Sequence, residues 1–343
     1  MNRLHPDLRR LSDLHFSQMM RFNLNLKAGL QRPRAWFGAL MGLGLVLPLG
    51  GCSDAGGTSG VPLVVVTTGQ IHDATRALVE GVEVELKLLC GPGVDPHSYG
   101  ASTGDVLAMD RAKLIVFNGF HLEAQLAELL EREAIAEKAW SMAGAFPAER
   151  RLNWSEDGVE TDGFDPHIWN DLWGWSASVE ALSTELAELF PAEAQRIAAN
   201  SERYVTEVTE MDAWAREELA RLPESRRVLV SGHDAFCYFA RNYGLETVAI
   251  LGVGNDPEAD LKSMRLVAEQ VVAKKVPAVF LESVTNPRLT QALIEACEAR
   301  GWSTRIADDP LYSDDLGVEA PVDTFLGAFR ANVEAISSAL GES

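Results

Sequence analysis

The chain has 343 residues, of which 47% are hydrophobic and 23% are charged, so it is long enough for two globular domains of ordinary size. Its formal net charge at pH 7 is −20. A chain this acidic argues against binding to nucleic acid and against docking through a basic surface onto an anionic membrane.

Residues 1–51 are predicted to be a lipoprotein signal peptide. Basic residues precede the apolar run AWFGALMGLGLVLPLG at 35–50, which is the order of a secretory signal. The run is shorter than the roughly 20 residues that a membrane-spanning helix needs. It ends in Leu-Gly-Gly-Cys and so resembles a bacterial lipoprotein signal, in which Cys52 becomes the lipidated N-terminus. The alternative is an ordinary secretory signal with a chance cysteine. Residues 52–60 are rich in Gly and Ser and are predicted to be a flexible tether.

Residues 61–190 are predicted to form an N-terminal α/β lobe. Runs of apolar and β-branched residues predict strands at 62–68, 82–89, 113–119 and near 138–142. Helical patterns lie between and after them, at 72–81, 104–112 and 122–137. Strands that alternate with helices indicate a parallel sheet.

Residues 191–223 are predicted to form a helix that links two lobes. From 192 to 222 the sequence has neither Gly nor Pro. A helix over this stretch would be about 45 Å long, which is too long for a crossover helix on a small sheet.

Residues 224–343 repeat the alternation of strands and helices. Strands are predicted at 226–232, 245–253, 276–283 and 302–308. The predicted fold class is therefore α/β, with two lobes that each hold a four-stranded, mostly parallel sheet flanked by helices, joined by one long rigid helix. A single large doubly wound domain is the alternative, but it leaves the long helix unexplained.

The tripeptide Asp-Pro-His occurs twice, at 95–97 and at 165–167, in a chain with only seven histidines. Proline holds φ near about −65° and favours an extended residue before it, so each histidine is presented from a stiffened turn. Asp95 and Asp165 can bond the backbone of that turn or the free N–H of the imidazole. His97 and His167 are therefore candidate ligands of a borderline cation such as Zn²⁺. Taken singly, each could equally be a hydrogen-bonded loop histidine.

A third histidine, His233, directly follows the strand at 226–232. Ligands of parallel α/β sheets bind beyond the carboxyl ends of the strands, so His233 is a further candidate. Glu282 ends the strand at 276–283 and either bonds a ligand histidine or caps a neighbouring helix. An oxygen ligand would come from the segment ADDPLYSDDLG, whose spacing does not choose among Asp308, Asp309, Asp314 and Asp315.

The other polar and aromatic candidates have structural interpretations. His121 is interpreted as structural and His72 as a surface or capping residue at a helix start. The Trp-rich stretch 168–175 is expected to pack under the site, and the acidic stretch 155–164 to be a solvated loop. Cys90, Cys237 and Cys297 are expected to be small buried residues, with one disulfide possible.

Several stretches together resemble the zinc/manganese solute-binding proteins of ABC transporters, also called helical-backbone metal receptors. They are VVVTTGQI, GPGVDPHSYGASTGD, VFNGFHLE, DPHIWND, SGHDAFCYFARNYGL, VPAVFLESVTNP and LYSDDLG. The resemblance covers nearly all of the chain after Cys52. It implies two (β/α)₄ lobes, a rigid linking helix, one metal ion in the cleft between the lobes and delivery to a membrane permease.

Carried over residue by residue, the resemblance implies the metal ligands His97, His167, His233 and Asp314. Asp95, Asp165 and Glu282 stay candidates, from the residues alone, for partners of the ligand histidines. The stretch before the second Asp-Pro-His has no histidine, although zinc-specialised members often carry a His-rich loop there. Many manganese members have Glu where this chain has His233. Three imidazoles favour zinc over manganese, because softer ligands and the Irving–Williams order both favour Zn²⁺.

We therefore expect an extracytoplasmic lipoprotein, in the periplasm or at the cell surface, that is monomeric and is not an enzyme. Two alternatives belong to other classes. One is a metal-dependent hydrolase, which would need a coordination position open to water. Its His-Asp pair at 233–234 is typical of all-helical phosphohydrolases, whereas here the pair follows a strand. The other is a surface adhesin, for which the chain shows no extended repeat.

Overall fold

The computed structural model describes residues 60–156, 159–253 and 261–341. The predicted signal peptide, Cys52 and all but the last residue of the predicted tether lie outside these ranges. Within these ranges, no helix combines the length and the apolar character that a membrane crossing requires.

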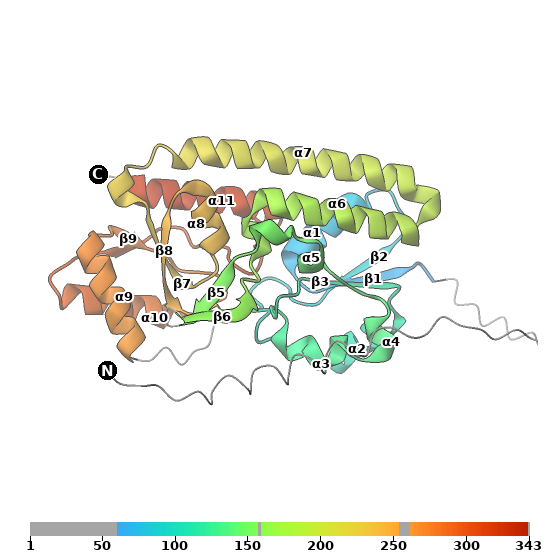
Figure 1. The fold of residues 1–343 in the computed structure, drawn as a ribbon, viewed down its shortest axis with the longest axis horizontal. Coiled ribbons are helices and arrows are strands. Elements are labelled where there is room, and N and C mark those ends of the chain that lie inside the picture. The colour runs from blue at the N-terminus through green and yellow to red at the C-terminus, as the bar shows by residue number, and fades with distance from the viewer. Residues whose placement is uncertain (1–59, 157–158, 254–260, 342–343) are drawn as a thin grey trace, which may run out of the picture. The chain divides into compact units, whose positions relative to one another are not determined.

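The first half of the described chain contains a four-stranded sheet in the order β2-β1-β3-β4 (Figure 1). The strands are β1 (Leu63–Val66), β2 (Glu85–Leu88), β3 (Leu114–Phe117) and β4 (Ala139–Ser141). All three pairings are parallel. β1 is buried on both faces, as expected for the central strand of a covered parallel sheet.

Helices cover both faces of this sheet. Val64 and Val66 of β1 pack on the side of α1 (Gly69–Leu78), whereas Leu63 and Val65 pack on the side of α2 (Thr103–Arg111). This alternation follows from the twofold period of a strand. α2 begins with a capping box, in which Ser102 and Asp105 each accept the other's backbone N–H. The predicted α/β class is confirmed.

The single long helix predicted over 122–137 is wrong. The segment contains a 3₁₀ turn at Ala124–Leu126, then α3 (Ala127–Leu130) and α4 (Glu133–Ala136). Arg132 is extended, with ψ of 131°, and separates α3 from α4. In one continuous helix Ile135 would point away from the face that carries Leu126. The break lets both side chains enter the same buried cluster.

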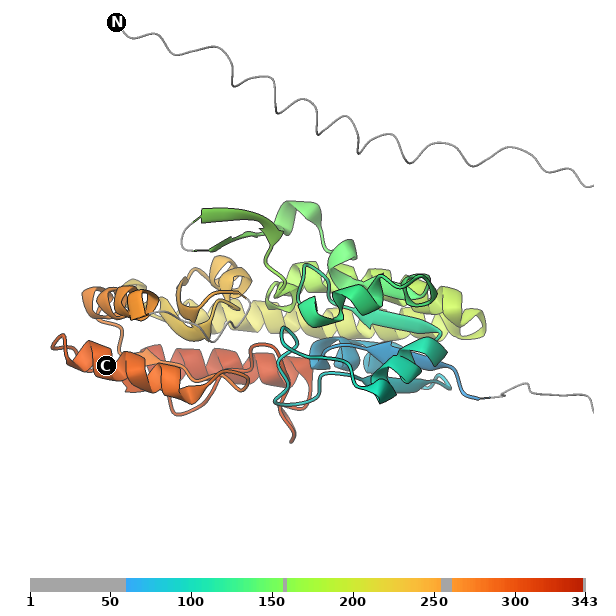
Figure 2. The same ribbon diagram turned by 90° about the horizontal axis from the view of Figure 1, so that it is seen from below.

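The acidic stretch predicted as a loop is an antiparallel hairpin, formed by β5 (Asn153–Glu156) and β6 (Val159–Phe164). Figure 2 shows it extending from the rest of the molecule. The apolar pattern gave no strand signal here because β6 reads VETDGF, and acidic residues and glycine are depleted in strands. The hairpin leads directly into Asp165, whose N–H donates to the Leu152 carbonyl.

Two antiparallel neighbours, α6 (Leu172–Leu189) and α7 (Ala194–Leu219), follow the hairpin. α7 has 26 residues and is about 39 Å long. It starts later than predicted because a 3₁₀ turn occupies Pro191–Glu193. Its buried stripe recurs every three or four residues, which is the spacing of one helix face; the stripe includes Ile197, Tyr204, Val208, Met211, Ala215 and Leu219.

The second half contains two parallel strand pairs. β7 (Val228–His233) pairs with β8 (Glu246–Leu251), and β9 (Ala278–Val279) pairs with β10 (Arg305–Ile306). The Phe280 N–H donates to the Val230 carbonyl and so joins the two pairs. The helices are α8 (Cys237–Tyr243), α9 (Leu261–Lys274), α10 (Pro287–Glu298) and α11 (Phe325–Gly341).

One buried apolar cluster runs through both halves. It includes Val64 of β1, Val208 of α7 and Phe329 of α11. Figures 1 and 2 both show α7 alongside α6 and α11. This core continues across both predicted boundaries. The division into lobes 61–190 and 224–343 with a link at 191–223 stays our proposal.

Candidate metal centre

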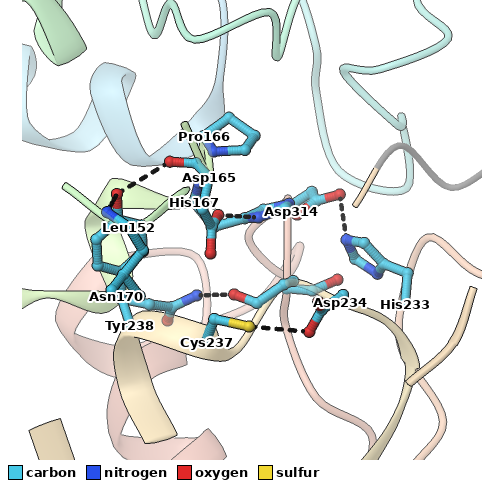
Figure 3. Close-up of polar contacts among 12 residues, drawn as sticks. Leu152, Asp165, Pro166, His167, Asn170, His233, Asp234, Cys237, Tyr238 and Asp314 are labelled. Atoms are coloured by element: carbon cyan, nitrogen blue, oxygen red, sulfur yellow. Dashed lines mark hydrogen bonds and ion pairs between the residues drawn. The ribbon is translucent and has the colours of Figure 1, made fainter. Parts of the chain in front are cut away.

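Four side chains that are far apart in the sequence meet at one point. His97, His167, His233 and Asp314 each offer one ligand atom, and these atoms all lie within 4.8 Å of one another. His97 is 8% exposed, while the other three are 0–1% exposed. Figure 3 shows His167, His233 and Asp314 converging. Each of these residues is a candidate ligand in the sequence, and the structure brings the four together.

The distances between the ligand atoms suit a small tetrahedral cation. His97 Nε2 and His167 Nε2 are 3.3 Å apart. Asp314 Oδ2 lies 3.1 Å from His233 Nε2 and 3.5 Å from His97 Nε2, and Asp314 Oδ1 lies 3.5 Å from His167 Nε2. A tetrahedron with metal–ligand bonds of about 2.0–2.1 Å has edges of about 3.3–3.4 Å. The four groups can therefore surround one ion without a large rearrangement.

Both Asp-Pro-His segments form the same turn. In each, the aspartate Oδ1 accepts the backbone N–H of the histidine two residues later at 2.9 Å. This is the Asx-turn geometry that a short carboxylate favours. The repeated tripeptide therefore has a conformational basis, because it presents His97 and His167 from turns that are closed by the same hydrogen bond.

The two aspartates differ in their second contact. Asp165 Oδ1 also accepts from Nδ1 of His167 at 2.7 Å, whereas Asp95 Oδ2 accepts from the Ser98 hydroxyl at 2.9 Å. Asp165 therefore fixes the His167 tautomer and leaves Nε2 free to face the centre. Asp95 shapes the turn around His97 and holds the backbone of that residue.

Glu282 holds His233 in the same way as Asp165 holds His167. Its Oε2 accepts from Nδ1 of His233 at 2.5 Å, and its Oε1 accepts the backbone N–H of His233 at 2.9 Å. A Cβ at Gly232 would lie 2.7 Å from the Thr285 hydroxyl and 3.0 Å from Glu282 Oε1. Glycine before His233 thus allows the carboxylate to approach the strand end.

The pKa values within the cluster diverge. Burial, with the neighbouring imidazoles, lowers the pKa of His97 to about 4, against the opposing pull of Asp314. Burial also acts to lower the pKa of His233, but the carboxylates of Glu282 and Asp314 outweigh it and raise that pKa well above its usual value. Burial opposes ionisation of Asp314, yet the three imidazoles hold its pKa well below its usual range. The site therefore keeps one permanent negative charge that faces three nitrogens.

Contacts to the backbone anchor the segment that carries Asp314. Trp169 Nε1 donates to the Ser313 carbonyl at 2.9 Å. Asn332 of α11 accepts the Tyr312 N–H and donates to the Tyr312 carbonyl, both at 2.8 Å. Trp169 lies in the stretch that we expected to pack under the site, and its ring stands edge-on to His167. The role of Asn332 had no sequence signal.

Side chains from both halves of the chain also hold the loop that carries His167. The Tyr238 hydroxyl donates to the Asp165 carbonyl and accepts the Leu152 N–H, each at 3.1 Å (Figure 3). Asn170 Nδ2 donates to the Ala235 carbonyl at 2.9 Å. Sequence reasoning missed both residues, because each bonds a backbone group, which any residue type can provide.

The remaining candidates lie elsewhere. His121 is exposed with φ of 63°, and His72 is half-buried within α1. Asp308 and Asp309 are exposed, whereas Asp315 is buried and bonds Gly93 and Ser283. The three cysteines in the described ranges are free. Cys90 and Cys297 are buried as expected, but Cys237 is only half-buried and donates to Asp234.

Comparisons with known proteins identify metal-binding relatives of this chain. A family model described as "ZnuA: Zinc-uptake complex component A periplasmic" matches residues 64–339. The zinc-binding protein TroA of Treponema pallidum (strain Nichols) is 37% identical over 291 residues, which are 84% of this chain and 92% of that protein. The manganese-binding lipoprotein MntA of Bacillus subtilis (strain 168) is 32% identical over 278 residues, 81% of this chain and 89% of that protein.

A solved structure of one of these relatives has a similar fold. The solved structure of the periplasmic zinc-binding protein TroA from Treponema pallidum matches with a TM-score of 0.77 and 37% sequence identity. The match covers 82% of this chain and 99% of that chain.

Proposed function

Because the chain belongs to the family of periplasmic zinc-uptake components, we propose that it captures one divalent transition-metal ion outside the cytoplasm and delivers it to the permease of an ABC transporter. Members of this family are substrate-binding receptors for metal transport rather than enzymes. This excludes the metal-dependent hydrolase that sequence analysis left as an alternative.

The observation that carries the proposal is the convergence of three imidazoles and one carboxylate within 4.8 Å. We assign His97, His167, His233 and Asp314 as the ligands of the transported ion. Asp165 and Glu282 orient two of the imidazoles, and Asp95 shapes the turn of the third. One chain supplies all four ligands, which supports a receptor that acts as a monomer.

Zn²⁺ is the proposed cargo ahead of Mn²⁺. Three nitrogen ligands suit a borderline cation, whereas Mn²⁺ prefers carboxylate, carbonyl and water oxygens. The relatives include proteins named for either metal. We also propose that Cys52 carries the lipid that anchors the protein, a role supported by the signal-like sequence before it and by the relative that is named a lipoprotein.

Metal titration of the purified protein tests the ligand assignment. We expect one Zn²⁺ per chain and displacement of bound Mn²⁺ by Zn²⁺ in competition. Replacement of His97, His167 or His233 by Ala should weaken binding by more than the roughly 10- to 100-fold that loss of an outer hydrogen-bond partner costs. Calorimetry and elemental analysis measure both the stoichiometry and the affinity.

His121→Ala provides the matched control, since His121 is an exposed histidine outside the cluster. It should bind the metal as the unaltered protein does. If all three ligand variants kept stoichiometric binding with unchanged affinity, the metal would lie elsewhere and the assignment would be wrong.

A further inference from the structure

The loop at 91–98, which carries His97, is held differently from the other ligands. His167 and His233 each donate from Nδ1 to a buried carboxylate, and the Asp314 segment is bonded by Trp169 and Asn332. Asp95 bonds the backbone of His97 and the Ser98 hydroxyl but leaves the imidazole alone. His97 is also the most exposed of the four ligands.

Both ends of this loop are fixed to the first half of the chain. The Cys90 N–H donates to the Thr67 carbonyl at 2.8 Å, and the Tyr99 hydroxyl donates to Asp105 at 2.6 Å. In the part of the chain that the structure describes, hydrogen bonds from residues 91–96 run either within the loop or to Asp315. The bond to Asp315 therefore joins the middle of the loop to the second half of the chain, while Val94 packs against the apolar cluster of the first half.

The carboxyl group of Asp315 accepts two hydrogen bonds. Its Oδ2 accepts the Gly93 N–H at 2.6 Å, and its Oδ1 accepts the Ser283 hydroxyl. The carboxylate is buried, with 3% of the residue exposed. A buried carboxyl group whose two oxygens both accept hydrogen bonds is held in one orientation.

Backbone pairing holds the segment that precedes Asp315. Leu311, four residues earlier, pairs with Glu282 as a parallel bridge, and its carbonyl accepts the Ser283 N–H at 3.1 Å. Ser283 directly follows Glu282, the residue that holds His233. Asp315 directly follows the proposed ligand Asp314. A single carboxylate thus ties the His97 loop to the segments that set the other side of the site.

Around the loop that carries His167, several side-chain contacts join the two halves of the chain. There Asn170 bonds Ala235, Tyr238 bonds Asp165, and Arg241 pairs with Asp171 at 2.6 Å. Removing one of them leaves the others in place. For the loop that carries His97, the hydrogen bond to the second half is the one between Gly93 and Asp315.

We propose that Asp315 is a positioning residue for metal retention, which holds the Gly93–His97 loop against the second half of the chain and so sets how long the ion stays bound. This inference rests on the proposed function, because it takes His97 as a metal ligand. Without the Gly93 contact, none of the hydrogen bonds of the described residues 91–96 reaches the second half of the chain, and His97 leaves the ion more often.

Release of Zn²⁺ to an excess of a chromogenic chelator, followed by stopped flow, tests the proposal. Asp315→Ala should accelerate release about 10- to 100-fold, the range typical for loss of an outer partner. Asp315→Asn retains one acceptor for the Gly93 N–H and should give a smaller acceleration. Asp309→Ala removes the same type of side chain from an exposed position in the same segment and should leave release unchanged.

A double-mutant cycle separates this role from general destabilisation. In the His97→Ala background, Asp315→Ala should add no further acceleration, because the loop no longer carries a ligand. In the His233→Ala background it should accelerate release as it does in the unaltered protein. An equal acceleration in the His97→Ala background, or none in the unaltered protein, would overturn the proposal.

A second variant covers the case in which Asp315→Ala does not fold. Ser283→Ala removes the hydroxyl that donates to Oδ1 of Asp315. This variant should accelerate release only when His97 is present. Release equal to that of the unaltered protein would count against the proposal. A protein that binds no Zn²⁺ at all would instead refute the proposed function, so the two failures are distinct.

Discussion

His97 and His233 lie in one cluster, yet their surroundings give them opposite proton affinities. Burial of His97, together with the neighbouring imidazoles, lowers its pKa to about 4 against the opposing effect of Asp314. Burial acts on His233 too, but Glu282 on one ring nitrogen and Asp314 on the other raise its pKa well above the usual value. Near neutral pH the free site therefore holds a proton on His233 and none on His97.

This difference predicts that metal binding releases a proton. The ion needs the neutral imidazole, so it must displace the proton from His233. We expect affinity to rise with pH up to the raised pKa of His233. His97 competes for protons only near pH 4. Calorimetry of Zn²⁺ binding at neutral pH, in two buffers of different ionisation enthalpy, should show release of about one proton or more per metal.

Glu282→Gln serves as the control for this prediction. The amide has the same shape but lacks the charge that raises the pKa of His233, so fewer protons should be released per metal. Equal apparent enthalpies in the two buffers would contradict the prediction.

The residues of the site differ in how far the sequence predicts them. A repeated motif points to His97 and His167, and its aspartates point to their turns. His233 follows from its place after a strand. Spacing alone left four aspartates open, and only the family resemblance favoured Asp314. Asp315 was weighed as a ligand, whereas it bonds a backbone N–H of a distant loop, a contact that leaves no pattern in the sequence.

The packing of α6 against Phe146 depends on one glycine near the start of the helix. Gly174 lies in the first turn of α6, where Asp171 accepts its N–H. A Cβ at this position would lie 2.2 Å from the ring of Phe146, which is itself buried. Phe146 in turn stands edge-on to Tyr238, the residue that bonds Asp165. The close approach of α6 and Phe146 therefore supports Tyr238, which bonds the loop that carries His167.

Gly174→Ala should destabilise the protein, although alanine is the better helix former. The intrinsic gain is about 1 kcal/mol, whereas overpacking in a core costs about 1–3 kcal/mol. A clash of this depth belongs at the upper end of that range, so we expect a net loss of about 1–2 kcal/mol. Urea denaturation measures it as a shift of the midpoint at an unchanged slope.

Thr184→Ala is the matched control in the same helix. Thr184 is exposed and its hydroxyl bonds only the Glu180 carbonyl one turn earlier. Its effect should stay within about 0.5 kcal/mol. A stabilised Gly174→Ala variant would show that Phe146 moves aside freely.

The elements that the sequence did not predict depend on contacts between segments, which a local sequence pattern does not report. The break at Arg132 depends on where Ile135 finds apolar neighbours, which local helical propensity does not report. The hairpin over β5 and β6 is held by backbone pairing between polar segments. In contrast, β1, β3 and β7 carry their own signal, since strands buried in parallel sheets are continuous apolar runs.

Over the whole molecule, α7 and the core cluster oppose a wide hinge motion. α7 packs against α6 and α1 in the first half and against α8 and α11 in the second. Ile197 near its start and Leu219 at its end belong to the same buried cluster. Rotating one half relative to the other would expose this apolar surface, at about 25 cal/mol per Å². Local movement of a loop, such as the one at 91–98, exposes much less.

Release of the metal should therefore leave the dimensions of the molecule nearly unchanged. We expect small-angle X-ray scattering of the purified protein to give the same radius of gyration, within error, with and without Zn²⁺. Hydrogen exchange should instead show local loss of protection without the metal, concentrated at the Gly93–His97 loop. A clear expansion of the metal-free protein would mean that the halves swing apart, and α7 would then have to bend or detach from one side of the core.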